Sequence, residues 1–138
     1  MKKATVILCV AMAMLLSTYA CKKKSTPTPA PMELLVSGGQ KIWQIEKLFI
    51  NDTLYNLTPE QLAYTKTYKS DSTFADSDGI SGKYVLTKNG TELQETLISG
   101  GSGKLIYTVE TLNNSSLVIR LINNGTSSLN NQFHFRAK

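Results

Sequence analysis

The fold class is decided by residues 82–98, which read GKYVLTKNGTELQETLI. Two runs with strand-forming composition flank Lys88-Asn89-Gly90, and an Asn-Gly pair between such runs is a strong signal for a tight β-hairpin. The segment therefore predicts two antiparallel strands, Gly82–Thr87 and Thr91–Ile98.

The same pattern of short strand-like runs and turn signals extends in both directions. Clean alternation of apolar and polar residues marks two of the later runs, Leu117–Ile122 and Gln132–Arg136. Thr58-Pro59-Glu60-Gln61 predicts one capped helical turn, since it has a cap residue, Pro at the first helical position and Gln three residues after the cap. About eight short strands predict an all-β domain, an antiparallel barrel or sandwich, over residues 33–138. The remaining predicted strands are Lys41–Ile50, Tyr64–Lys69, Ser72–Asp76 and Lys104–Leu112.

The first twenty residues have the layout of an export signal. Met1-Lys2-Lys3 is positively charged, and Ala4–Leu16 is an apolar run of 13 residues followed by small and polar ones. A membrane-spanning helix is the competing interpretation, but it needs about 17–25 apolar residues. We therefore predict a signal peptide over residues 1–20.

The junction Tyr19-Ala20-Cys21 resembles the lipobox at which bacterial lipoproteins are acylated on cysteine and cleaved, with Thr18 where Leu is commoner. The alternative is an ordinary signal cut after Ala20. Cys9 would leave with the signal, so an unmodified Cys21 would be a lone thiol in an oxidising compartment. The sequence therefore predicts lipidation of Cys21 and attachment to a membrane through that lipid.

Residues 21–32, CKKKSTPTPAPM, are expected to form a tether. Its alternating prolines favour an extended chain of about 3.1 Å per residue, which gives a reach of roughly 30–35 Å. Lys22 follows the cysteine where Asp would favour the inner membrane, so lipoprotein sorting points to the outer membrane. An acidic surface-export run is missing, which favours the periplasmic face. The three lysines fit either contact with anionic headgroups or simple solvation of the tether.

The basic balance of the chain does not indicate nucleic-acid binding. The formal net charge is +5, from fifteen basic and ten acidic residues. Five of the basic residues precede Ser25, so the domain from Glu33 carries ten of each sign. A near-neutral domain without a basic stripe lacks what a phosphate backbone requires.

Several motifs together carry a family resemblance that covers Leu34 to about Leu121. They are Glu33-Leu34-Leu35 with the pair Gly38-Gly39, Trp43-Gln44-Ile45, Tyr68–Phe74, Asp78–Leu86, Tyr107–Leu112 and Leu117–Arg120. This arrangement resembles the lipocalin-like domain of small bacterial envelope lipoproteins. The resemblance implies a small antiparallel β-barrel and a binding role, and it carries no catalytic motif with it.

The interior of such a barrel is open to two interpretations. Eight strands make a barrel just wide enough to be filled by its own side chains or to hold one small ligand. Aromatic residues at strand positions are normally core packing, and we expect Trp43, Phe74, Tyr84 and Tyr107 in the core.

No catalytic or metal-binding set emerges from the sequence. His134 is the single histidine and alternates with phenylalanines on a terminal strand, where its side chain is expected to face outward. Asp76-Ser77-Asp78-Gly79 resembles the start of a calcium loop but lacks the other ligands, so a turn is favoured. Glu92 with Glu95 is interpreted as part of a solvated strand face. Neither a cofactor nor a metal is expected.

The sequence thus predicts a non-enzymatic, lipid-anchored envelope lipoprotein. Its domain would bind a small apolar or glycan ligand, or a protein partner. The alternative is a structural or accessory lipoprotein with a filled barrel that docks on an outer-membrane assembly. The volume of the interior cavity separates these two, since ligand pockets usually measure about 300 Å³ or more.

Overall fold

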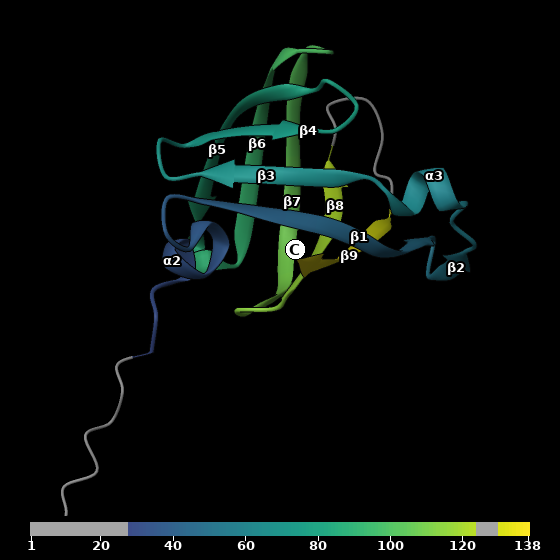
Figure 1. Ribbon diagram of the computed structural model, residues 1–138, viewed down its shortest axis with the longest axis horizontal. Helices are drawn as coiled ribbons and strands as arrows, with labels where there is room; N and C mark the ends of the chain where they lie inside the picture. Colours follow the sequence, from purple (N-terminus) through teal and green to yellow (C-terminus); the bar gives the residue numbers. More distant parts are fainter. Residues whose placement is uncertain (1–27, 124–129) are drawn as a thin grey trace, which may run out of the picture.

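The structure is a computed structural model that describes residues 28–123 and 130–138 (Figure 1). The predicted signal peptide, the predicted lipidation site Cys21 and most of the predicted tether lie outside the described residues. Among the helices that are described, none is long and apolar enough to cross a membrane. The elements are α2 (Pro31–Val36), β1 (Gln40–Ile50), β2 (Thr53–Tyr55), α3 (Pro59–Leu62), β3 (Thr65–Lys69), β4 (Thr73–Asp76), β5 (Ser81–Thr87), the short 3-10 turn η1 (Lys88–Gly90), β6 (Glu92–Ser99), β7 (Gly103–Leu112), β8 (Ser116–Asn123) and β9 (Asn131–Ala137).

Eight strands of the described chain close into an antiparallel barrel, as the sequence predicted. Strand β1 pairs with β3, each strand from β3 to β8 pairs with the next one along the chain, and β9 pairs back onto β1. The short strand β2 forms a hairpin on the far end of β1 and lies outside this ring. All eight predicted strands are present, with bounds that shift by at most one residue at either end. The turns at Lys88-Asn89-Gly90 and Ser77-Asp78-Gly79 also form as predicted.

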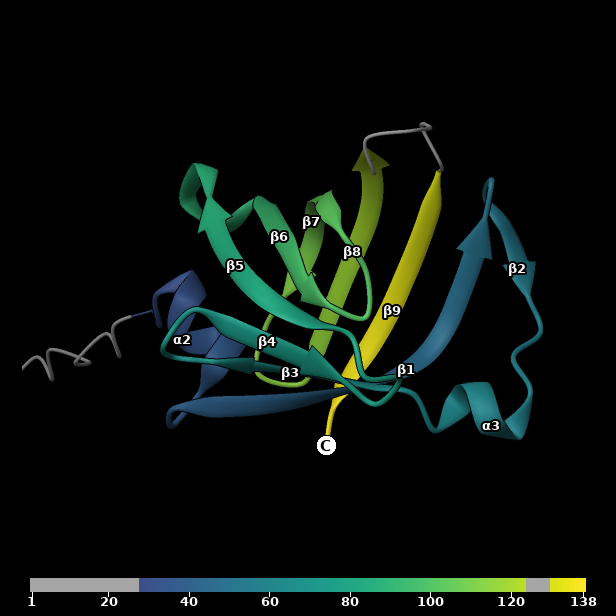
Figure 2. The same ribbon diagram turned by 90° about the horizontal axis from the view of Figure 1, so that it is seen from above.

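Strand β1 pairs with three strands: β3 and β9 in the ring, and β2 outside it. The pairing with β3 covers Gln40–Gln44, and the pairing with β9 covers Trp43–Ile50 with a register shift between Ile45 and Lys47. Such an irregularity bends a strand and increases its twist. The bend carries the end of β1 away from β3 and alongside β2 (Figure 2).

One end of the barrel is filled by α2, which the sequence did not predict. Leu35 is fully buried there, and its carbonyl oxygen accepts a hydrogen bond of 3.1 Å from the Trp43 indole nitrogen. Pro31 and Met32, assigned to the tether from the sequence, form the first turn of this helix. The tip of the β5–β6 hairpin also touches it: Gly90 has a φ of +89°, and a Cβ there would lie 2.4 Å from the Pro31 ring. We call this the closed end.

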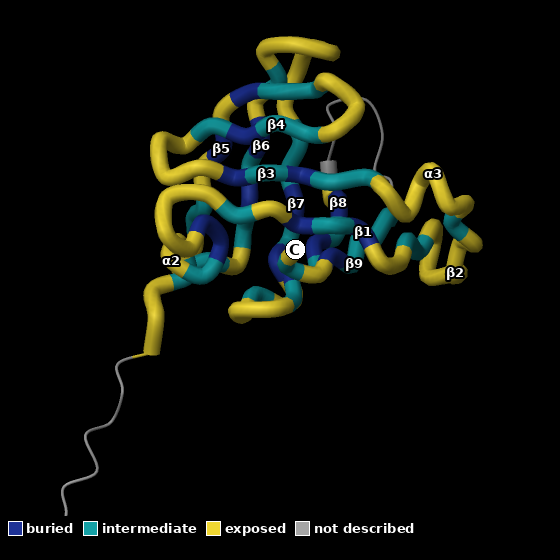
Figure 3. The backbone as a smooth tube through the Cα atoms, viewed as in Figure 1, coloured by how far each residue is buried: buried dark blue, intermediate teal, exposed yellow. Residues whose placement is uncertain are grey.

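The core runs from the closed end through the barrel (Figure 3). Trp43, Phe74, Tyr84 and Tyr107, the four residues expected in the core, are all buried. The Tyr84 hydroxyl donates a 2.7 Å hydrogen bond to the Lys69 carbonyl, so its polar atom is satisfied. Every member of the described core lies between Leu35 and Phe135. A chain from Thr28 to Lys138 therefore carries the whole of this described core, and we expect it to fold on its own.

The other end carries α3 and the β4–β5 turn, and we call it the open end. Helix α3 forms at the predicted position, where the Thr58 hydroxyl and the Gln61 side chain cap each other's backbone amides. Figure 2 shows α2 and α3 at opposite ends of the molecule.

Candidate functional site

A cavity of about 480 Å³ enters the barrel from the open end. Its deep wall is formed by buried side chains of β1, β7, β8 and β9, among them Ile45 and Ile119. Exposed residues of α3 and of the β4–β5 turn, such as Glu60 and Asp78, stand at its mouth. The lining residues are Ile45, Leu48, Leu57, Glu60, Gln61, Tyr64, Lys66, Asp76, Asp78, Ile80, Glu95, Leu97, Leu105, Tyr107, Ile119, Phe133 and Phe135.

A buried ion pair crosses the interior at the base of this cavity. The Lys66 ammonium on β3 donates to both carboxylate oxygens of Glu95 on β6, at 3.0 and 2.9 Å. The two side chains are 7 % and 0 % exposed. Removing two charges from water is costly, and only a close geometry with further hydrogen bonds offsets that cost.

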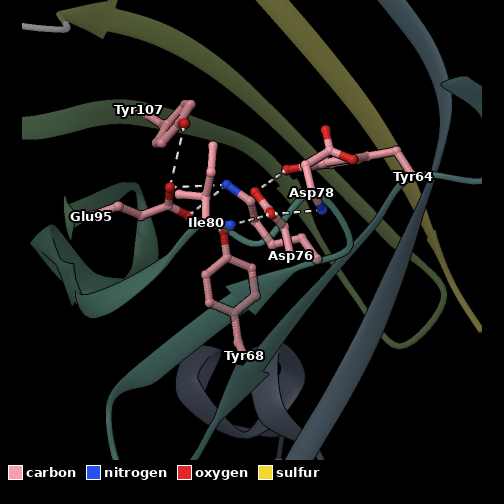
Figure 4. Close-up of polar contacts among 8 residues, drawn as sticks. Tyr64, Tyr68, Asp76, Asp78, Ile80, Glu95 and Tyr107 are labelled. Atoms are coloured by element: carbon pink, nitrogen blue, oxygen red, sulfur yellow. Dashed lines mark hydrogen bonds and ion pairs between the residues drawn. The ribbon is translucent and has the colours of Figure 1, made fainter. Parts of the chain in front are cut away.

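Two tyrosines supply those further hydrogen bonds (Figure 4). The Tyr68 hydroxyl donates to one oxygen of Glu95 at 2.5 Å, and the Tyr107 hydroxyl approaches the other oxygen at 3.4 Å. Burial, and then the negative charge of Glu95, raise the pKa of both tyrosines well above the usual value of 10.0. Both hydroxyls therefore stay protonated and serve as donors to Glu95 at neutral pH.

A second polar group lies between this pair and the mouth. The Tyr64 hydroxyl donates to Asp76 at 3.0 Å, while the other oxygen of Asp76 accepts the backbone amides of Asp78 and Ile80 at 3.0 and 2.9 Å. Burial, and then the charge of Asp76, raise the pKa of Tyr64. Asp76 thus fixes the β4–β5 turn, which is the role expected for Asp in a turn.

The sequence interpretation was wrong about Glu95, which was expected on a solvated strand face. It is fully buried, because β6 turns Leu93, Glu95 and Leu97 toward the interior. The same period of two places Lys66 on β3 between Tyr68 and Tyr64, the residue that directly precedes the strand. For both Lys66 and Glu95, the residues two positions before and two positions after are apolar or aromatic. This pattern was the signal in the sequence that the charged side chain points inward.

His134 lies away from the cavity, on β9. It is half-buried, its ring centroid lies 5.1 Å from that of Phe49, and one ring nitrogen shares a 2.8 Å hydrogen bond with Gln132. In residues 28–123 and 130–138, His, Cys, Asp and Glu side chains form no group of three that could hold a metal ion.

Comparison with protein families, with curated proteins and with solved structures finds no match to this chain. We therefore infer the function from the geometry of the cavity.

Proposed function

We propose that this chain is a lipid-anchored envelope lipoprotein whose lipocalin-like barrel binds a small, largely apolar ligand in the cavity. In this proposal it is not an enzyme, and it is held by the lipid on Cys21 at the outer membrane, facing the periplasm. The observation that supports the binding role best is the cavity itself. Its volume of about 480 Å³ lies within the range of about 300–1,000 Å³ that small-molecule sites occupy.

The shape of the interior favours a ligand over a purely structural role. The barrel packs tightly at the closed end, where α2 covers Trp43, and is hollow toward the open end. A barrel that served only as a docking block would gain stability by filling that volume with side chains. The apolar wall favours an apolar ligand over a glycan, which needs many polar partners.

The position of the N-terminal segment fits this role. Residues 28–30 lead into α2 at the closed end (Figure 2), so a tether attached there leaves the cavity mouth at the opposite end of the domain. Ligand could then enter from the side away from the anchor.

Binding is tested with the neutral fluorescent probe N-phenyl-1-naphthylamine and the chain from Thr28 to Lys138. We expect saturable fluorescence enhancement and a melting temperature that rises with probe concentration, since the probe binds the folded state alone. Leu105→Trp places a larger side chain in the half-buried cavity wall and should weaken binding about tenfold or more.

The matched control is Val85→Trp, because Val85 is 55 % exposed and is not part of the cavity lining. It should bind the probe as the parent does. Absence of saturable binding to the parent, or equal binding by Leu105→Trp, would count against a ligand site in the barrel.

The anchor is tested in the bacterial cell by the variant Cys21→Ser. We expect the parent to incorporate labelled palmitate and to sediment with membranes, and the variant to incorporate none. One acyl chain gives marginal membrane binding and two or more give stable attachment, so the acylated parent should be almost wholly membrane-bound. Palmitate label that persists in Cys21→Ser would exclude this cysteine as the acylation site.

A further inference from the structure

Negatively charged side chains outnumber positively charged ones in the cavity lining, and the charges lie at different depths between its mouth and its base. Four carboxylates and one ammonium face it: Glu60, Asp76, Asp78 and Glu95 against Lys66. Glu60 and Asp78 are exposed at the mouth, Asp76 is half-buried, and Lys66 and Glu95 lie at the base.

The charges at the base are satisfied by one another. Lys66 is bound to both oxygens of Glu95, and Tyr68 and Tyr107 direct their hydroxyls at the same carboxylate. The exposure of the two charged side chains, 7 % and 0 %, leaves little polar surface for a ligand to meet there. The charges at the base of the cavity therefore compensate each other, and the walls between the base and the mouth are apolar.

The charges nearer the mouth have no such compensation among the lining residues. Hydrogen bonds from its own backbone amide and from Thr58 lower the pKa of Glu60, so it is ionised at neutral pH. Asp76 makes its hydrogen bonds to a tyrosine hydroxyl and two backbone amides, which are neutral donors. An entrance lined with one sign of charge above low-dielectric walls concentrates ligands of the opposite sign.

We propose that the cavity selects amphiphiles with a cationic end group, such as an alkylamine, and discriminates against carboxylates of the same chain length. The apolar chain lies in the barrel above the Lys66–Glu95 pair, and the ammonium lies at the mouth among Glu60, Asp76 and Asp78. This inference rests on the proposed binding function: the cavity argues for a ligand, and the carboxylates decide its charge.

The test compares three competitors that differ in the end group alone: dodecylamine, dodecanol and dodecanoate. Each displaces N-phenyl-1-naphthylamine from the chain Thr28–Lys138 at pH 7 and low salt, below its micelle-forming concentration. We expect dodecylamine to compete at least about tenfold more strongly than dodecanoate, with dodecanol between them. Higher salt should reduce the difference in affinity between dodecylamine and dodecanoate, since about 0.1 M salt screens exposed charges beyond roughly 10 Å.

Two variants locate the source of the selectivity. Glu60→Gln combined with Asp78→Asn should reduce the ratio of amine to carboxylate affinity to about threefold or less, mainly because the amine binds more weakly. Asp71→Asn is the control, because Asp71 is an exposed acid in the β3–β4 turn outside the cavity lining, and it should leave the ratio as in the parent.

The outcomes separate this inference from the binding function. If the neutral probe binds and the three competitors displace it equally, or dodecanoate is preferred, the charge selectivity is overturned and the binding function stands. An amine preference that survives the double variant would also overturn the assignment to these carboxylates. If the probe does not bind the parent at all, both proposals fall.

Discussion

Glu95→Gln is expected to lower the free energy of unfolding by about 3–5 kcal/mol, the range for removing one partner of a buried ion pair. Gln keeps nearly the same shape but replaces one carboxylate oxygen by an NH2 group and removes the negative charge. The buried Lys66 ammonium therefore keeps at most one of its two oxygen partners and loses its compensating charge. Tyr68 and Tyr107 lose part of their charge-assisted hydrogen bonding as well. Denaturant titration followed by circular dichroism measures the change.

A second pair in the same chain provides the control. Lys88 and Glu92 form an ion pair on η1 and β6, but the lysine side chain is 69 % exposed. Exposed pairs contribute about 0–1 kcal/mol, so Lys88→Met should change the unfolding free energy by less than 1 kcal/mol.

The double variant Lys66→Met with Glu95→Leu completes the comparison. It removes both buried charges at once, and apolar replacement of a buried pair is often close to neutral. We therefore expect it to be more stable than Glu95→Gln alone. A Glu95→Gln variant as stable as the parent would mean that the pair is hydrated through the cavity.

Trp43→Ala is expected to cost about 3–5 kcal/mol, as large-to-small changes of buried aromatic residues do. The indole is fully buried between the barrel and α2, and it holds the helix by its hydrogen bond to the Leu35 carbonyl. Lys41 also places its ammonium 4.3 Å from the centre of the indole ring. Domains of this size have total stabilities of about 5–15 kcal/mol, so the variant should be partly unfolded on mild heating.

Circular dichroism is the measurement for this variant, since Trp43 is the single tryptophan and its fluorescence disappears with it. Val85→Ala removes apolar volume from a side chain that is 55 % exposed, and should cost less than about 0.5 kcal/mol. A loss below about 1 kcal/mol for Trp43→Ala would show that α2 does not depend on the indole.

The strands could be predicted because their signals are local. Lys88-Asn89-Gly90 specifies a turn by its own backbone preferences, and Thr58 with Gln61 specifies a cap within four residues. Helix α2 escaped prediction because its six residues depend on packing against Trp43 and Tyr84, which the local sequence does not display.

The site was harder to predict because its geometry is not local. Lys66 and Glu95 lie on strands that are not neighbours, so their contact depends on the closure and register of the whole barrel. Whether the interior is hollow depends on the total volume of the side chains that all the strands direct into it. No short motif determines that volume. The alternation on β3 and β6 could have placed both charges inside, but not opposite each other.

The pairing of β9 with β1 has a consequence for how the chain reaches its folded state. The ring joins the first strand of the barrel to the last, so it cannot close until Asn131–Ala137 has left the ribosome. Until then β1 and β8 keep unpaired edges, and contacts between distant parts of a chain form slowly. Such delayed closure suits a polypeptide that crosses a membrane before it folds, which the proposed export signal would require.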